Sequence, residues 1–138
     1  MREALVLEGA DDSIHVERIP GVVPNPKQWR GHYDAIVTVE KIEQLSPQER
    51  KEYIRAVDRF LTPNGRAGIQ SLVATEAMTD AGKASIQALR AYVWPALDYP
   101  LTAELHQLVD KNSNLRIVSE THVGTHYLES LRQQRSFF

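Results

Sequence analysis

A strand–helix–strand unit across residues 35–73 constrains the fold more than any other feature of the sequence. Residues 35–39 form a continuous apolar run, typical of a strand covered on both faces, and the acidic residue Glu40 follows it. Residues 66–73 are predicted to form the next strand. Two strands joined by a helical crossover lie parallel in one sheet, so these two are expected to be neighbours. The sequence therefore predicts an α/β fold.

The helix between these strands carries a signal at each end. Ser46-Pro47-Gln48-Glu49 supplies an N-cap, a proline at the first helical position and a capping-box glutamate. The turn Pro63-Asn64-Gly65 ends it, because Asn and Gly tolerate positive φ. One face is expected to be buried, since apolar residues recur at helical spacing: Tyr53, Ile54, Val57, Phe60 and Leu61.

Weaker patterns predict further elements on both sides of this unit. Residues 2–9 are expected to form one or two helical turns, and residues 14–17 a short strand. A second helix opens at Thr79-Asp80 and a third is capped by Thr102. The second helix is expected to have an apolar face of Ile86, Leu89, Tyr92 and Val93. Residues 115–121 and 123–128 are expected to form a closing antiparallel strand pair.

Composition excludes several classes of function. The 138 residues are 42% hydrophobic and 25% charged, as expected for one globular domain. A net charge of −2 gives no electrostatic reason to expect nucleic acid. The lack of cysteine excludes disulfides and a cysteine nucleophile. No signal peptide or membrane-spanning run is evident, so a cytoplasmic location is expected.

Four segments, in the same order, resemble a family of lipid-modifying enzymes. Residues 33–43 are similar to the F/Y-D-x-I-V-S segment, with its later Glu-His, of cyclopropane-fatty-acyl-phospholipid synthases and mycolic acid methyltransferases. Residues 60–66 resemble the LL-x-PGGR turn of that family, residues 92–100 its Y-I-F-P-G-G-x-L-P segment, and residues 124–131 its G-x-H-Y-x-x-T-L segment. The match covers residues 33–131, and residues 1–32 fit more loosely as an entry segment.

The resemblance implies one truncated domain, residues 1–138, with a partial Rossmann-like class I methyltransferase fold. Its sheet would be mostly parallel with a closing antiparallel strand pair. The chain contains no G-x-G-x-G sequence, so it lacks the glycine-rich strand–loop–helix of the N-terminal half. The family uses S-adenosylmethionine to methylenate a cis double bond in an unsaturated acyl lipid. The alternative is a non-catalytic methyltransferase-fold module for binding or dimerisation.

The same resemblance implies the site residues. Methyl transfer to an alkene leaves a carbocation, from which a base must remove a proton. In relatives a bound bicarbonate is the implied base, and Glu43, Gln70 and Tyr127 match the catalytic positions that hold it. Glu40 and Lys41 match the cofactor-binding loop. The histidine that follows the glutamate in the family is Gln44 in this chain.

Simpler interpretations stand beside these roles. Glu43 could be a surface carboxylate favoured by the helix dipole, Gln70 a solvated amide and Tyr127 a core tyrosine. Three aromatic residues could line an acyl tunnel or merely pack: Tyr92, Trp94 and Tyr99. His122 and His126 share a face if residues 123–128 form a strand, but no third ligand is evident, so no metal site is predicted.

The missing half has a consequence for the sheet. Without the strands that precede it in the family, the strand at residues 35–39 becomes an exposed apolar edge. We expect this edge to be covered by the strand at residues 14–17, by a second copy in a homodimer, or by a separate polypeptide that supplies the missing N-terminal half.

Overall fold

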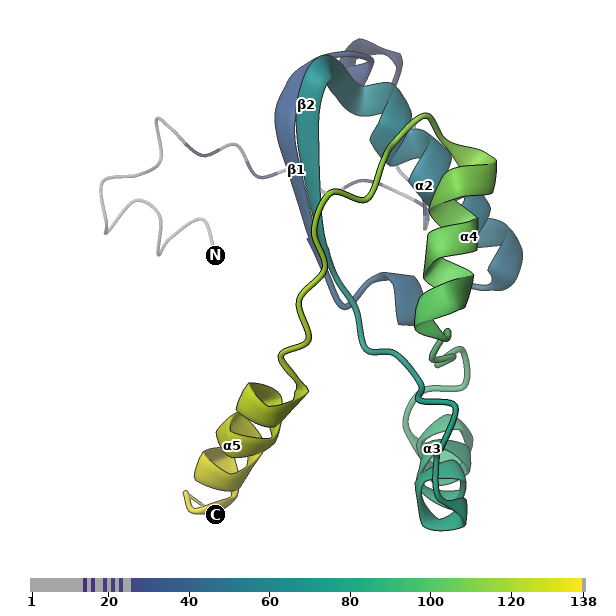
Figure 1. The fold of residues 1–138 in the computed structure, drawn as a ribbon, viewed down its shortest axis with the longest axis vertical. Coiled ribbons are helices and arrows are strands. Elements are labelled where there is room, and N and C mark those ends of the chain that lie inside the picture. The colour runs from purple at the N-terminus through teal and green to yellow at the C-terminus, as the bar shows by residue number, and fades with distance from the viewer. Residues whose placement is uncertain are drawn as a thin grey trace.

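The computed structural model describes residues 26–137, together with Ile14, Val16, Ile19, Gly21 and Val23. Figure 1 shows a small sheet with one helix against it, a second helix beside the first, and two further helices beyond the ends of the strands. The elements are η1 (Lys27–Trp29), β1 (Tyr33–Val39), η2 (Ile42–Gln44), α2 (Pro47–Phe60), β2 (Leu61–Gln70), α3 (Asp80–Tyr92), α4 (Thr102–Asn112) and α5 (Gly124–Arg135).

The two strands are parallel neighbours, as predicted from their connection. Their register runs from Ala35 opposite Arg66 to Val39 opposite Gln70. The Pro63-Asn64-Gly65 turn lies inside β2 as an irregularity. A Cβ added to Gly65 would lie 3.0 Å from the Tyr33 carbonyl oxygen, so this close approach requires glycine.

Helix α2 begins where the sequence predicted but ends at Phe60, before the Pro63-Asn64-Gly65 turn, because Leu61 already starts β2 and neither Asn64 nor Gly65 adopts positive φ. The Ser46 hydroxyl accepts a bond from the Glu49 amide, and the Ser46 amide donates to the Glu49 carboxylate at 2.8 Å, which completes the capping box. One face of α2 covers the sheet, and α4 packs on α2 (Figure 1). The resulting core contains Ile42, Ile54 and Val109, surrounded by Tyr53, Leu105, Leu108 and Leu115.

Helices α3 and α4 also occur where they were predicted. Thr79 caps α3 by accepting a bond from the Gly82 amide at 3.2 Å. Thr102 is the first helical residue of α4 rather than its cap, a shift of one position, because Leu101 occupies the cap. Helix α3 buries none of its residues, so its apolar face lies open rather than against a core.

The prediction of a closing antiparallel strand pair was wrong. Residues 113–123 have no regular structure, and Gly124–Arg135 forms helix α5. Tyr127, Leu128 and Leu131 recur at helical spacing, and the Leu, Glu, Gln and Arg residues around them favour helix over strand. The short alternation of apolar and polar residues in this region is compatible with either a strand or a helix. The sheet of the described residues is therefore two-stranded and parallel.

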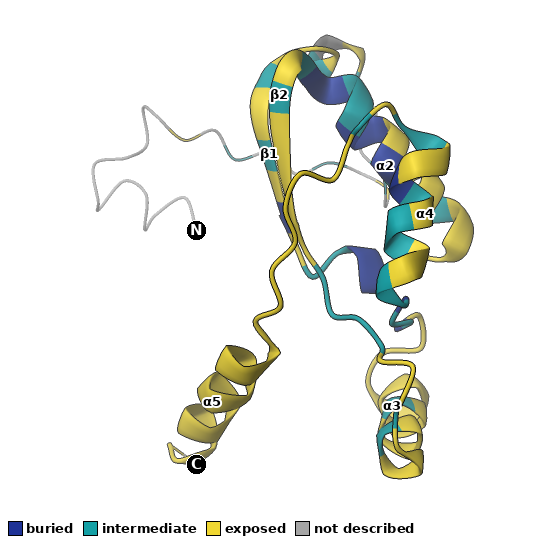
Figure 2. Cartoon of the chain, viewed as in Figure 1, coloured by how far each residue is buried: buried dark blue, intermediate teal, exposed yellow. Residues whose placement is uncertain are grey.

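One face of β1 is open. Val37 and Val39 are 77% and 58% exposed, whereas Thr38, on the α2 side, is buried. The expectation that this strand is covered on both faces is wrong for the single chain, because these side chains remain exposed among the described residues, and Figure 2 colours most of β1 and β2 as exposed. The helix expected at residues 2–9 lies outside the described residues, as does the strand at residues 14–17 apart from Ile14 and Val16. No helix in the described part of the chain is long and apolar enough to cross a membrane.

Candidate functional site

The candidate site lies where the two parallel strands end. After β1 the chain turns sharply at Glu40, which adopts φ 51°. The Glu40 amide donates to the Gln70 carbonyl at 2.9 Å, and the Gln44 side chain donates to the Glu40 carbonyl at 2.6 Å. These bonds hold the acidic loop against the end of β2. The carboxyl ends of parallel strands are where α/β folds place ligand-binding groups.

Glu43 lies at the centre of this region and is 2% exposed. Its carboxylate accepts one bond from the Ser71 hydroxyl at 2.9 Å and another from the Leu72 amide at 3.2 Å. A buried carboxylate needs such donors, since its desolvation is otherwise costly. The interpretation of Glu43 as a surface carboxylate is therefore wrong.

Tyr127 comes to the same place from the first turn of α5. Its side chain is 37% exposed. The negative charge of Glu40 is the main reason why the pKa of Tyr127 is raised, with partial burial, hydrogen bonding to Glu40 and the charge of Glu43 acting in the same direction. Tyr127 thus lies near Glu40 and within the influence of the Glu43 charge, although it lies on a helix rather than on the expected strand.

Gln70 and Lys41 lie at the border of this cluster. Gln70 is exposed and is the register neighbour of Val39, so its side chain lies on the open face of the sheet. Its carbonyl, rather than its amide side chain, contacts the acidic loop. Lys41 directly precedes η2 and is partly exposed.

Tyr99 is part of the same cluster. It is partly buried, and the neighbouring Asp98 amide donates to the Glu43 carbonyl at 2.8 Å. Burial raises the pKa of Tyr99, and the charges of Glu43, Tyr127 and Glu40 raise it further. Sequence reasoning placed Tyr99 only in a tunnel or in plain packing. Its place beside Asp98 in the conspicuous 92–100 segment was the available signal.

Two arginines and Asp98 hold this cluster in place. The Arg50 side chain donates to the Ile42 carbonyl at 3.0 Å and to the Asp98 carbonyl, and it pairs with the Asp98 carboxylate at 3.1 Å. Arg90 of α3 pairs with the other oxygen of that carboxylate at 2.6 Å. Sequence reasoning missed all three residues, because Arg50 and Asp98 lie 48 positions apart.

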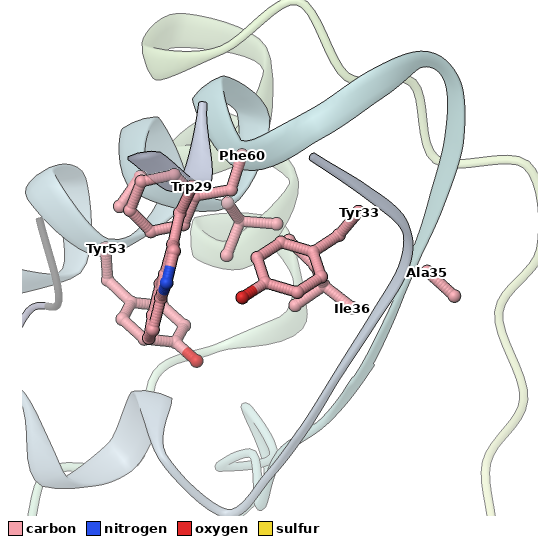
Figure 3. A pocket seen from close by; sticks show the side chains of 8 residues that line it. Trp29, Tyr33, Ala35, Ile36, Tyr53 and Phe60 are labelled. Atoms are coloured by element: carbon pink, nitrogen blue, oxygen red, sulfur yellow. The ribbon is translucent and has the colours of Figure 1, made fainter. Parts of the chain in front are cut away.

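A separate apolar cavity lies near the amino end of β1. Its volume is about 240 Å³. Trp29 packs edge-to-face against both Tyr33 and Phe60 at its wall (Figure 3). The lining residues are Trp29, Tyr33, Ala35, Ile36, Tyr53, Ala56, Val57 and Phe60. None of them belongs to the Glu43 cluster.

The histidines lie elsewhere. His106 and His122 both contact the Glu120 carboxylate, at 2.7 and 2.8 Å. The hydrogen bond with His106 is the main reason why the pKa of Glu120 is lowered. His122 lies before α5 and His126 within it, so they do not share a strand face. Within residues 26–137 and the five isolated positions, no three His, Asp or Glu side chains form a group that could hold a metal ion.

The family follows from comparison with known proteins. The family model described as mycolic acid cyclopropane synthetase matches residues 21–138. The chain belongs to this family. Over 108 residues it is also 28% identical to tuberculostearic acid methyltransferase UfaA1 of Mycobacterium tuberculosis (strain ATCC 25618 / H37Rv). That alignment covers 78% of the chain and 25% of the relative, so the chain spans about a quarter of that protein's length.

The match confirms the resemblance drawn from the four sequence segments, and the family is one of S-adenosylmethionine-dependent methyltransferases. The described residues fit only part of a site for that cofactor. Glu40 and Lys41, which the resemblance assigns to cofactor binding, follow β1, whereas the glycine-rich loop has no counterpart in this sequence. These residues therefore do not form a complete cofactor site by themselves.

Proposed function

We propose that this chain is the C-terminal part of an S-adenosylmethionine-dependent methyltransferase of the cyclopropane-fatty-acid synthase type, acting on unsaturated acyl lipids. The observation that carries the proposal is the buried carboxylate of Glu43 at the carboxyl end of β1. The charges of Glu40 and Glu43 both act on Tyr127. A carboxylate shielded from water stabilises a nearby cation more strongly than an exposed one does.

In this proposal each site residue has a separate role. Bound S-adenosylmethionine would supply the methyl group, and Glu40 and Lys41 would contact it. Glu43 would stabilise positive charge that develops on the lipid. The Gln70 amide is a donor that could hold a bicarbonate base, and the Tyr127 hydroxyl could join it if it left Glu40, to which it is hydrogen-bonded. The Ser71 hydroxyl and the Leu72 amide are already bonded to Glu43, so an anion would depend on the other donors.

The open face of β1 supports the proposal of a partner. Val37 and Val39 present an apolar surface beside an edge with no strand partner among the described residues. Such edges are usually covered, because they otherwise template aggregation. We propose that either a second copy of the chain or a polypeptide with the glycine-rich half covers this edge and completes the cofactor site.

A second candidate function is a non-catalytic module for binding or dimerisation. The observation that favours it is the lack of buried residues in α3 and in α5. Two amphipathic helices with uncovered faces are typical of surfaces that contact another protein. In this function the Glu43 cluster would be a structural remnant.

Calorimetric titration with S-adenosylhomocysteine tests the proposal, with the mass of the protein in solution measured first. Micromolar binding, about −8 kcal/mol, is expected if the cofactor site is complete in the species present. Glu40→Gln should weaken the binding, whereas Glu129→Gln, on exposed α5, should not. A stable self-associated species that gives no heat at millimolar ligand would instead support the non-catalytic function.

A further inference from the structure

Asp98 is the meeting point of three parts of the molecule. Its amide donates to the Glu43 carbonyl at 2.8 Å. Its carbonyl and its carboxylate both receive the guanidinium of Arg50 from α2. Arg90 from α3 binds the remaining carboxylate oxygen at 2.6 Å.

Arg50 is the buried one of the two arginines that bind Asp98. Its side chain is 8% exposed, and a buried cation must be paired and hydrogen-bonded. The same guanidinium reaches the Ile42 carbonyl at 3.0 Å. The carbonyls of two successive residues, Ile42 and Glu43, are thus held by Arg50 and Asp98 respectively.

Arg90 is the more exposed of the two arginines that bind Asp98. Its side chain is 43% exposed, and ion pairs on the surface contribute little to stability. Its Nε donates to the Leu97 carbonyl at 2.5 Å rather than to any part of η2. The two arginines therefore share one carboxylate but differ in whether they reach the turn that carries Glu43.

We propose that Arg50, acting through Asp98, is a positioning residue for Glu43. The two residues fix the backbone of the Ile42–Gln44 turn while Ser71 and Leu72 fix the Glu43 carboxylate, so that the carboxylate keeps its place at the carboxyl end of β1. The inference depends on the proposed function only in taking Glu43 as the functional carboxylate of the site.

Burial is the main reason why the pKa of Tyr99 is raised, and the charge of Glu43 is the next cause. The ionisation of Tyr99 therefore responds to a displacement of Glu43 without cofactor or substrate. To isolate the absorbance change of Tyr99 from that of the other tyrosines, each protein is titrated with and without Tyr99→Phe, and the two curves are subtracted. Arg50→Lys keeps the charge but replaces the planar guanidinium, whose Nε and terminal nitrogen bond Ile42 and Asp98 separately, with one compact ammonium that does not match their spacing. It should shift the ionisation midpoint of Tyr99 downward, because the charge of Glu43 moves away. Arg90→Lys, the same change at the more exposed arginine, should leave the midpoint in place.

Tyr127 supplies an internal control, since Glu40 rather than Glu43 is the main influence on it. Its midpoint, measured with Tyr127→Phe, should move less than that of Tyr99 in Arg50→Lys. An unchanged Tyr99 midpoint, or equal shifts in Arg50→Lys and Arg90→Lys, would overturn the proposal. If circular dichroism shows that Arg50→Lys does not fold, Asp98→Glu, which also keeps its charge, takes its place with the same readings. Because the titration needs no S-adenosylhomocysteine, its result is separable from that of the calorimetry.

Discussion

Removal of the Ser71 hydroxyl tests how Glu43 is held. In Ser71→Ala, the buried Glu43 carboxylate loses its 2.9 Å donor and keeps only the Leu72 amide at 3.2 Å. A hydrogen bond to a charged group contributes about 1.5–3 kcal/mol, and the site is too enclosed for water to replace it freely. We therefore expect the free energy of unfolding to fall by about 1.5–3 kcal/mol.

Urea denaturation followed by circular dichroism measures this change, and two comparisons isolate its cause. Ser130→Ala makes the same substitution on exposed α5, where the hydroxyl bonds only to the His126 carbonyl at 3.1 Å. Its effect should be within about 0.5 kcal/mol of zero. In a Glu43→Gln background, Ser71→Ala should cost only about 0.5–1.5 kcal/mol, because the acceptor is neutral. An equal cost in both backgrounds would refute the reasoning.

Three further predictions concern the rest of the molecule. Glu40→Gln should lower the pKa of Tyr127, because the Glu40 charge that disfavours the phenolate is removed. Absorbance titration measures this pKa, and an unchanged or higher midpoint would contradict the prediction. Ile54→Ala should destabilise the protein by about 2–5 kcal/mol in urea denaturation, since Ile54 is 1% exposed in the core, and a loss below about 1 kcal/mol would show that α2 is loosely packed. Val37→Lys should abolish any self-association or partner binding seen by sedimentation, because Val37 is 77% exposed on the open face of β1; unchanged association would place the interface elsewhere.

Local chemistry made parts of the fold predictable. Helix α2 could be located because the Ser46 capping box, a proline and a regular apolar face all lie within the helix itself. The parallel pairing of β1 and β2 followed from their connection. Residues 124–135 were less predictable, since a short apolar alternation is compatible with strand or helix and their neighbours decide between them.

The candidate site divides in the same way. Glu43 and Tyr127 could be named from short segments that match the family, and the structure adds that Glu40 is the main influence on the pKa of Tyr127. The 92–100 segment drew attention to Tyr99, but the contacts of Asp98 with Glu43 and Arg50 could not be predicted. Their contacts come from segments distant in sequence, which only folding brings together.

The sequence alone determined the strand–helix–strand unit, the family and the acidic residues that follow β1, because these depend on local pattern and spacing. The tertiary structure decided that Glu43 is buried, that Arg50 and Asp98 hold its backbone, and that one face of β1 lies open. Burial and long-range pairing depend on which segments meet in space, and the chemistry of one segment does not specify that.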